Sequence, residues 1–520
     1  MNISKAIATL ACLSALGIAQ VAAAKPMTIL YVPLDNRPDN TTYVEQTLAG
    51  AGCKVIMPPE KFIANNIENG KPDRLMDWLF TKAPKADAAV ISTDSLIYGG
   101  LVASRTHQQS LADLKERVAK FNELERALPI KLYAFSTIMR TPRASQGRVE
   151  PEYYAEFGPK IFEISELIDK NDQHRLNAAD TQRLKALVRQ VPYDDLKDWF
   201  ERRAKNLEVN RELLKLSNRK KFHFFAIGKD DNAKLCHTHM EARKLSMLTF
   251  NYPKEHFQLI DGVDQLGLLL AARAYNELSK QKPSIYPLYS EGIGQGTLPQ
   301  YSDARFQDSV PQQILASGSK VASTPYEADF ILAINSPDDG IVQDATAKSN
   351  KYYASMPNKR FIAKLNDLAK HGYKLSLADV SYSNGGDNGF MHHFAVSGGL
   401  NRLIAYNGWN TADNTIGYAI AQGIFAEATP APVLNKIIRQ RVIDDWFYQS
   451  NARNKLTQRF EKITREDLKY SLGALNKQTV MDARETCYQL SEKYDFTKNS
   501  KYQLSFPWDR LFEVNIFIKK

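Results

Sequence analysis

Cysteine is scarce in this sequence of 520 residues, which contains only four. Cys12 lies in an apolar N-terminal segment, and Cys53, Cys236 and Cys487 are far apart along the chain. Three widely spaced cysteines do not make the disulfide framework of a small secreted domain. Two states stay open for them: one disulfide with one free thiol, or three buried thiols that pack as small apolar side chains.

Long hydrophobic runs are missing after the first 24 residues. At the start, Lys5 is followed by an apolar, alanine-rich stretch that ends in three alanines at Ala24. A basic residue, a short apolar core and small residues at its end are typical of a secretory signal peptide. We therefore expect cleavage near Ala24, a periplasmic or secreted protein, and no integral membrane segment in the mature chain.

Nucleotide-binding and metal-binding motifs are also missing. Neither G-x-G-x-x-G nor G-x-x-x-x-G-K-[ST] occurs between a strand and a helix. His237 and His239 are two residues apart on an expected helix, so their side chains face different directions. We predict no cofactor, although a divalent ion bound by aspartate-rich strand ends stays open.

The formal net charge of +10 bears on the partner of the protein. Many basic residues fall on stretches with helical periodicity, which is typical of solvated helix faces. Export argues against nucleic acid as a partner, so the expected partner is a small molecule or a glycan. A positive chain is also attracted to anionic polymers of a cell envelope.

What the sequence does contain, from Thr28 onward, is an alternation of short apolar strands, polar clusters and helical segments. This alternation predicts an α/β fold with mainly parallel sheets. The alternative is a (β/α) barrel with a second domain. Ten strand candidates exceed one eight-stranded barrel, which favours two α/β units.

Composition suggests where these units begin and end. The predicted divisions are a signal peptide at 1–24, a first α/β domain at 25–282, a second at 283–430 and a helical C-terminal region at 431–520 that ends in an edge strand. A long polar stretch at about 143–221 has helical periodicity, so we expect a helical insertion there that covers the site.

Polar residues follow the expected strands of the first domain at the point where each strand ends. In parallel sheets, ligands bind at the carboxyl ends of the strands. The candidate site residues here are Asp35, Asn36, Arg37, Asp94, Tyr98, Arg105, Arg140 and Asp230.

Two carboxylates in one cleft can have different pKa values, so that one acts as an acid and the other as a base or nucleophile. We predict Asp35 and Asp94 as this catalytic pair, and arginines beside them as ligands for an anionic or hydroxylated substrate. The structural alternative is that each aspartate caps a helix and each arginine balances a buried carboxylate.

The second domain offers a further set of polar and aromatic residues near its strand ends. Trp409 is a candidate stacking platform for a sugar ring. Amide and carboxylate side chains near it suit hydroxyl or N-acetyl groups. The expected binding residues are Asp379, Asp387, Trp409, Asn410 and Asn414.

Four motifs are spread over nearly the whole mature chain. They are Leu34-Asp35-Asn36-Arg37-Pro38, Asp94 through Arg105, Trp409-Asn410-Thr411 and Trp508-Asp509-Arg510-Leu511-Phe512-Glu513-Val514. The chain thereby resembles an uncharacterised bacterial family described only as a domain of unknown function. The resemblance implies membership of that family and transfers no activity.

Three functions are compatible with these residues. The leading hypothesis is an exported hydrolase that acts on a carbohydrate, an envelope amino sugar being one candidate. The first alternative is a two-lobed periplasmic protein that binds a small molecule or sugar without catalysis. The second is a metal-dependent amidase or esterase.

Overall fold

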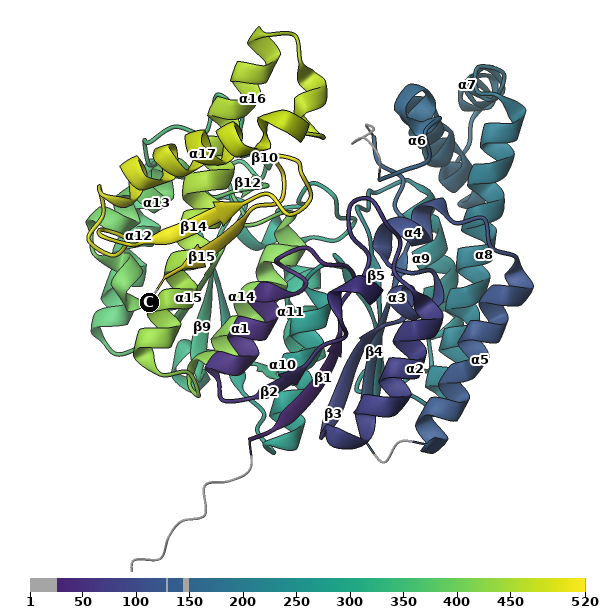
Figure 1. Ribbon diagram of the computed structural model, residues 1–520. Coiled ribbons are helices and arrows are strands. Elements are labelled where there is room, and N and C mark those ends of the chain that lie inside the picture. Colours follow the sequence, from purple (N-terminus) through teal and green to yellow (C-terminus); the bar gives the residue numbers. More distant parts are fainter. Residues whose placement is uncertain (1–25, 128–129, 144–148, 520) are drawn as a thin grey trace, which may run out of the picture.

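The first sheet is built entirely from parallel strands of the first half of the chain (Figure 1). The computed structural model describes residues 26–127, 130–143 and 149–519, so the expected signal peptide lies outside the described residues. The strand order is β2-β1-β3-β4-β5-β6. The strands are β1 (Thr28–Val32), β2 (Lys54–Ile56), β3 (Ala88–Ser92), β4 (Lys131–Ile138), β5 (Phe224–Lys229) and β6 (Phe257–Asp261).

The second sheet repeats this arrangement with five parallel strands in the order β13-β11-β9-β7-β8. These are β7 (Ser284–Tyr289), β8 (Lys320–Val321), β9 (Phe330–Asn335), β11 (Leu375–Asp379) and β13 (Leu403–Asn407). In each sheet the second strand of the chain lies on one side of the first strand, and the later strands lie on its other side. Such a reversal leaves a crevice at the carboxyl ends of the strands. The expected α/β fold with two parallel sheets is confirmed, and both sheets are open rather than closed into a barrel.

Helices between the two sheets join them into one hydrophobic core. They are α1 (Thr42–Gly50), α10 (Leu266–Leu278), α11 (Phe306–Ala316) and α14 (Ala412–Ala426). Every residue of α14 is buried, because its two faces contact α10 and the second sheet. The core they share includes Val90 of the first sheet and Leu332 of the second.

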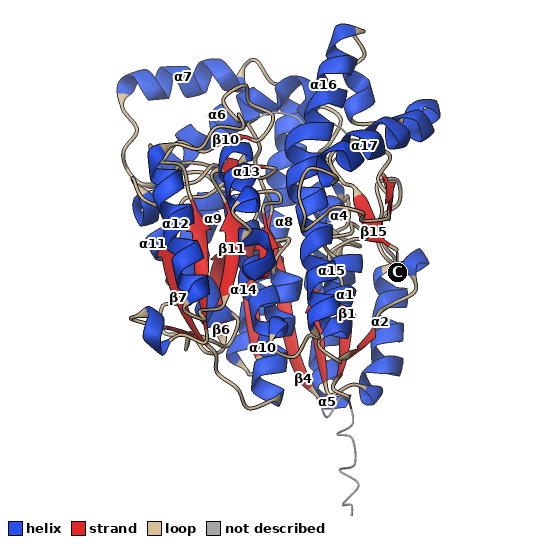
Figure 2. Ribbon diagram, turned by 90° about the vertical axis from the view of Figure 1, so that its left-hand side faces the viewer, coloured by secondary structure: helices blue, strands red, loops and turns tan. Residues whose placement is uncertain are grey.

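The outer face of the first sheet is covered by helices whose apolar sides pack on alternate strand residues. These helices are α2 (Pro72–Lys82), α5 (Leu111–Ala127), α8 (Tyr193–Asn218) and α9 (His237–Leu248), with the short α3 (Thr93–Ile97) and α4 (Leu101–Thr106) at the strand ends. The expected helical insertion consists of α6 (Tyr154–Asp172), α7 (Ala178–Val188) and α8. It projects beyond the sheet and has a small core of its own around Trp199 (Figure 2).

The outer face of the second sheet is covered mainly by the C-terminal region. The helices on this face are α12 (Met356–Lys370) and α13 (Asn388–Val396) from the second domain, followed by α15 (Ala431–Arg441), a π-helix (Val442–Ala452), α16 (Arg453–Lys462) and α17 (Asn476–Ser491) from the C-terminal region. Two small sheets complete it: β10 (Gln343–Asp344) beside β12 (Tyr382–Ser383), and β14 (Tyr502–Ser505) antiparallel to β15 (Asn515–Ile518). The helices expected in the C-terminal region are therefore present, and β15 is the last strand that the structure describes.

Two further expectations concern membranes and thiols. Within the described ranges, no helix is long and apolar enough to cross a membrane. Cys53, Cys236 and Cys487 are all buried and free, which resolves the open question in favour of three buried thiols.

Candidate active-site cavity

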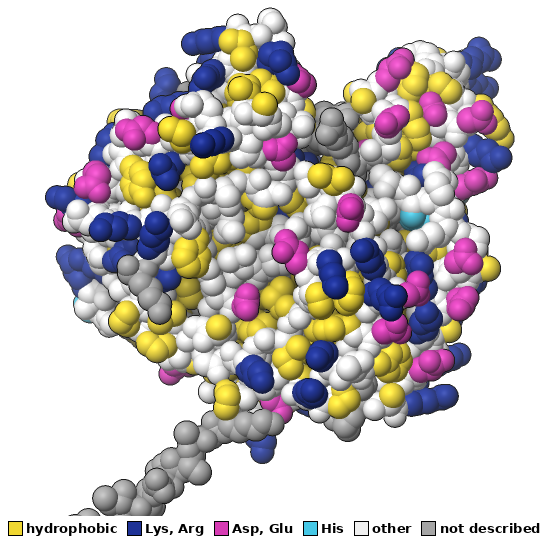
Figure 3. Space-filling view, in the orientation of Figure 1, with side chains coloured by type: hydrophobic (Ala, Val, Ile, Leu, Met, Phe, Trp, Pro, Cys, Tyr) yellow, Lys and Arg dark blue, Asp and Glu magenta, His cyan; other side chains and the backbone are white. Residues whose placement is uncertain are grey.

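A cavity of about 300 Å³ lies at the carboxyl ends of the strands, between both sheets and the C-terminal region. This volume is at the lower end of small-molecule sites. Its charged lining residues are Asp35, Asp230, Asp231, Asp264, Asp344 and Glu513, with Arg37, Arg105, Arg140, Arg453, Lys469 and Arg510. Figure 3 shows a notch on this side of the molecule, between the lobe that carries α16 and the lobe that carries α6 and α7.

The segment after β3 reaches the cavity through a tight glycine turn. The carbonyl of Asp94 accepts backbone hydrogen bonds from Tyr98, Gly99 and Gly100. Both glycines have positive φ, and a Cβ on Gly100 would lie 2.6 Å from the Cβ of Ala64. Only glycine fits this turn, which carries α4 and Arg105 to the cavity wall.

Arg37 connects the ends of β1 and β6. Its Nε donates to both carboxylate oxygens of Asp35, and its Nη2 donates to Oδ1 of Asp264 at 2.5 Å. Asp35 also accepts from the backbone N–H of Arg37 and from Nδ2 of Asn40. All four side chains are buried, and the hydrogen bonds of Asp35 hold the loop in place.

A second network of charges connects β4, β5 and the segment after β3. Arg105 donates to Oδ2 of Asp230 at 2.6 Å, and Arg140 donates to Oδ2 of Asp231 at 2.6 Å. Glu150 lies between the two arginines: it accepts from Nε of Arg140 at 2.7 Å and is 3.8 Å from Nη1 of Arg105. Because the residues alternate in charge, each arginine holds two carboxylates in place.

Asp230 and Asp231 differ from the other carboxylates of the cavity because each keeps one oxygen available. Within the described ranges, Oδ1 of each accepts no hydrogen bond, whereas both oxygens of Asp35, Asp264, Asp344 and Glu513 are engaged. The Asp230 side chain is 5% exposed and that of Asp231 is 19% exposed. Burial raises the pKa of Asp230 above its ordinary value, and the nearby Arg105 partly offsets this shift.

Asp94, one of the two expected catalytic residues, is buried behind the lining rather than in it. It accepts a hydrogen bond from the hydroxyl of Thr137, and its Oδ2 has no partner among the residues that the structure describes. Burial raises the pKa of Asp94 to about 7. The structure therefore brings Asp35, Arg37, Arg105, Arg140 and Asp230 to one cavity and leaves Asp94 below it.

The C-terminal region supplies the opposite wall, which we call the roof: lining residues 453–470 and 508–513. Trp508 joins the roof to the loop after β1, because its Nε1 donates to Oδ1 of Asn36 at 2.7 Å. The π-helix supports the roof, since Tyr448 and Gln449 donate to the carbonyls of Leu511 and Phe512. The 508–514 motif carries part of the family resemblance, but no local pattern in it predicted a place in the site.

The residues expected from the second domain divide into two groups. Asn410 and Asn414 line the cavity: Asn410 donates to Asp264 at 2.7 Å, and Asn414 accepts from the backbone N–H of Val263 and Asp264. The expected stacking platform, Trp409, is instead 1% exposed, because it packs against aromatic residues of α14 and the roof.

Four other expected site residues also lie outside the cavity lining: Asn36, which accepts from Trp508, and Tyr98, Asp379 and Asp387. Asp387 caps α13, and its backbone N–H donates to Asp379 at 2.8 Å, so the two form a buried pair. Burial raises the pKa of Asp379 well above its ordinary value. Tyr98 is buried and stacks on His107. These residues support the fold around the site without reaching the cavity.

Strained backbone is concentrated at this cavity. Non-glycine residues with positive φ are uncommon and tend to occur at functional sites. Some in this chain simply follow helix ends, such as His174 after α6 and Lys220 after α8. Four others line the cavity: Asp231 (φ 34°), Tyr301 (φ 66°), Asn384 (φ 61°) and Asn410 (φ 65°).

Metal ligands do not gather in the described parts of the chain, where no group of three or more His, Cys, Asp or Glu side chains could hold a metal ion. His237 is buried on α9, and Nδ1 of His239 donates to Oδ2 of Asp169 of the insertion at 2.6 Å.

Comparison with known families is consistent with the motifs. A family described as a protein of unknown function, DUF4127, matches residues 29–517. The match covers both sheets, the insertion and the roof, and therefore all the residues that line the cavity. No curated protein and no solved structure matches the chain.

Proposed function

The chain belongs to the DUF4127 family, a family of unknown function, and we propose that it is an exported hydrolase acting on a carbohydrate. An envelope amino sugar is one candidate substrate. The catalytic groups of this proposal are Asp230 and Asp231, which replace the pair expected from the sequence, Asp35 and Asp94. Asp35 has both oxygens engaged by Arg37 and Asn40, and Asp94 does not line the cavity.

One observation carries this proposal: two adjacent carboxyl groups in one cavity have different surroundings, and each has one oxygen that accepts no hydrogen bond from a described residue. Asp230 is buried with a raised pKa, which suits a general acid. Asp231 is more exposed and forms an ion pair with Arg140, which suits a base or nucleophile. The remaining carboxylates are engaged with arginines, amides or backbone groups.

The proposed reaction uses these groups as follows. Asp230 gives its proton to the glycosidic oxygen while the bond from that oxygen to the anomeric carbon breaks. Water supplies the new oxygen at the anomeric carbon, and Asp231 takes the proton that the water loses. Asp231 then releases this proton to solvent and Asp230 takes one up from solvent, so both groups return to their starting states and the net reaction consumes one water.

Aromatic side chains of the cavity support a sugar as the substrate. Tyr301 and Tyr470 both line the cavity and are 36% and 42% exposed. Their rings offer apolar faces beside hydrogen-bonding groups, a combination that suits a sugar ring. They take the role that was expected of Trp409.

The binding-protein alternative is favoured by one observation, namely that residues from both sheets line the cavity. The shared core argues against it. A two-lobed binding protein closes around its ligand by hinge motion, whereas α10 and α14 pack the two sheets into one continuous core. The metal-dependent amidase or esterase has no observation in its favour.

The test is an assay of sugar release from envelope glycans by the purified protein. We expect the wild type to release reducing sugar, and Asp230→Asn and Asp231→Asn to lose about a hundredfold or more of that activity. Asp77→Asn, an exposed aspartate on α2, is the matched control and should keep full activity. Absence of glycan turnover by the wild type, or full activity in both site variants, would refute the proposal.

A further inference from the structure

We infer that the substrate carries an anionic group, a carboxylate or a phosphate, that binds to the cations of the roof. This inference rests on the proposed function, because it names the class of sugar that the same cavity would bind. Its basis is the set of cavity N–H groups and carboxylate oxygens that make no hydrogen bond with the described residues.

The carboxylate oxygens of the cavity are almost fully engaged by described residues. Asp35 and Asp264 are bound by Arg37, and Glu513 is bound by Nε and Nη2 of Arg510. Asp344 accepts from Thr346 and from Asn384. The unused carboxylate oxygens belong to Asp230 and Asp231, which the proposed reaction uses. Few carboxylate oxygens are therefore left for the donors of a ligand.

Cationic donors remain available beside them. Within the described part of the chain, Nη1 of Arg453 and Nη1 of Arg510 donate no hydrogen bond. On the opposite wall, Nε of Arg105 is buried without a partner among the described residues. Because arginine cannot lose its proton in a protein, each of these groups attracts an acceptor that carries negative charge.

Arg453 is the strongest of these candidates. Its Nε and Nη2 donate to the carbonyls of Gln449 and Asn384, which fix the guanidinium without neutralising it. The nearest carboxylate, Asp344, is 3.7 Å away and already engaged by other donors. The guanidinium is thus held in position with an incompletely balanced charge, an arrangement that favours a bound anion.

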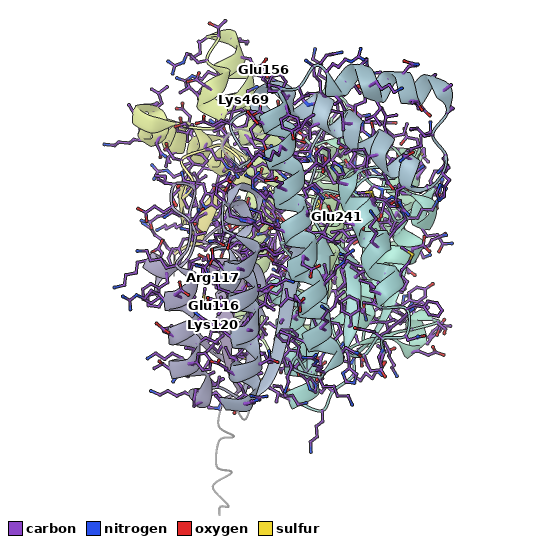
Figure 4. All side chains as sticks on the ribbon, turned by 90° about the vertical axis from the view of Figure 1, so that its right-hand side faces the viewer. Glu116, Arg117, Lys120, Glu156, Glu241 and Lys469 are labelled. Atoms are coloured by element: carbon purple, nitrogen blue, oxygen red, sulfur yellow. The ribbon has the colours of Figure 1, made fainter. Side chains whose placement is uncertain are left out.

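Lys469 adds a second positive charge to the roof. Its Nζ pairs with Glu461 at 2.9 Å, and its side chain is 20% exposed, so an ammonium with three donors has capacity for a ligand. Figure 4 shows Lys469 at the upper end of the molecule, whereas Lys120 lies lower on α5. Carboxylate and phosphate share the chemistry that these two roof side chains, Arg453 and Lys469, recognise.

The experiment measures binding by calorimetry with the full chain that starts after Ala24. The probes are glucuronic acid and glucose 6-phosphate, with glucose as the neutral match. We expect at least one anionic sugar to bind about tenfold or more tightly than glucose. Its affinity should fall as sodium chloride is added, because salt screens charge.

Paired variants test whether the roof is responsible. Arg453→Gln and Lys469→Gln should each reduce affinity for the anionic sugar about tenfold and leave affinity for glucose unchanged. Arg459→Gln, on the same helix and paired with Asp482, and Lys120→Gln, paired with Asp73, are matched controls that should bind as the wild type does. The Lys469 side chain is partly exposed, so we expect the Lys469→Gln variant to fold. It therefore tests the roof even if the Arg453→Gln variant fails to fold.

The outcomes separate this inference from the proposed function. Preference for glucuronic acid alone, or for glucose 6-phosphate alone, supports the inference and identifies the anionic group. Equal affinity for all three sugars overturns it, as does loss of affinity in the control variants. Binding of an anionic sugar without any glycan turnover refutes the hydrolase and leaves this inference intact. Turnover of neutral glycans with no preference for anionic ones supports the hydrolase and refutes this inference.

Discussion

Arg105 donates a hydrogen bond from Nη2 to Oδ2 of Asp230 at 2.6 Å, and this contact joins the segment after β3 to the end of β5. Both side chains are 5% exposed. The pair therefore does two things: it fixes the proposed acid at the cavity wall, and it partly offsets the effect of burial on the pKa of Asp230.

Replacement of Arg105 by alanine tests this pair. It leaves the Asp230 carboxylate buried without its cation, and we expect a stability loss of about 3–5 kcal/mol in urea unfolding. Burial raises the pKa of Asp230 and Arg105 lowers it, so the pKa rises further in the variant. The alkaline limb of the pH–activity profile should then move to higher pH. Adding Asp230→Asn to the same chain should restore much of the stability, and a double variant as unstable as the single one would contradict this explanation.

Asp94→Asn tests the buried carboxyl below the cavity. Burial raises the pKa of Asp94 to about 7, so between about pH 4 and pH 7 the folded chain holds a proton that the unfolded chain releases. The contribution of Asp94 to stability therefore falls as the pH rises through this window. Relative to the wild type, the asparagine variant should gain up to about 3 kcal/mol in urea unfolding between about pH 5 and pH 8. An unchanged difference between the two proteins would refute this assignment.

The three described cysteines give a prediction about redox state. All are buried and free, and burial raises the pKa of the Cys53 thiol to about 11. The thiolate is the reactive form, so these groups should react with a thiol reagent slowly in the folded protein and quickly after unfolding. Dithiothreitol should not change the melting temperature, whereas a lower value in dithiothreitol would indicate a disulfide.

Local patterns in the sequence were enough to predict the floor of the cavity. Short apolar strands followed by polar clusters placed Asp35, Arg37, Arg105, Arg140 and Asp230 at strand ends, and all five line one cavity. This succeeded because the carboxyl ends of parallel strands lie along one edge of a sheet. The pattern could not show that α4, which follows Gly99-Gly100, would line the cavity while Asp94 stays buried outside the lining.

The roof depends on contacts between residues that are far apart in sequence. Trp508 reaches Asn36 across more than 470 residues, and nothing local to either residue predicts this hydrogen bond. Trp409 illustrates the opposite error. Its neighbours are amides, as at a sugar site, but the start of α14 at Ala412 turns the indole into the core beside Tyr418. Local composition could not distinguish these two environments.

Asn410→Asp tests the contact between the second sheet and the floor. Asn410 donates from Nδ2 to Oδ2 of Asp264 at 2.7 Å and has φ of 65°, which aspartate also tolerates. The substitution therefore replaces a donor by a carboxylate next to Asp264, where Arg37 is the shared cation. We expect a stability loss of about 1–3 kcal/mol at neutral pH in urea unfolding, and a smaller loss in acid, where one carboxyl takes up a proton.

Asn499→Asp is the matched control for this substitution. Asn499 has nearly the same backbone conformation, with φ of 61°, but its exposed side chain makes no hydrogen bond with the described residues. Its variant should be as stable as the wild type at both pH values. If Asn410→Asp were equally harmless, the amide of Asn410 would not hold the second sheet to the floor, and Arg37 would be the one described side chain that fixes the Asp264 carboxylate.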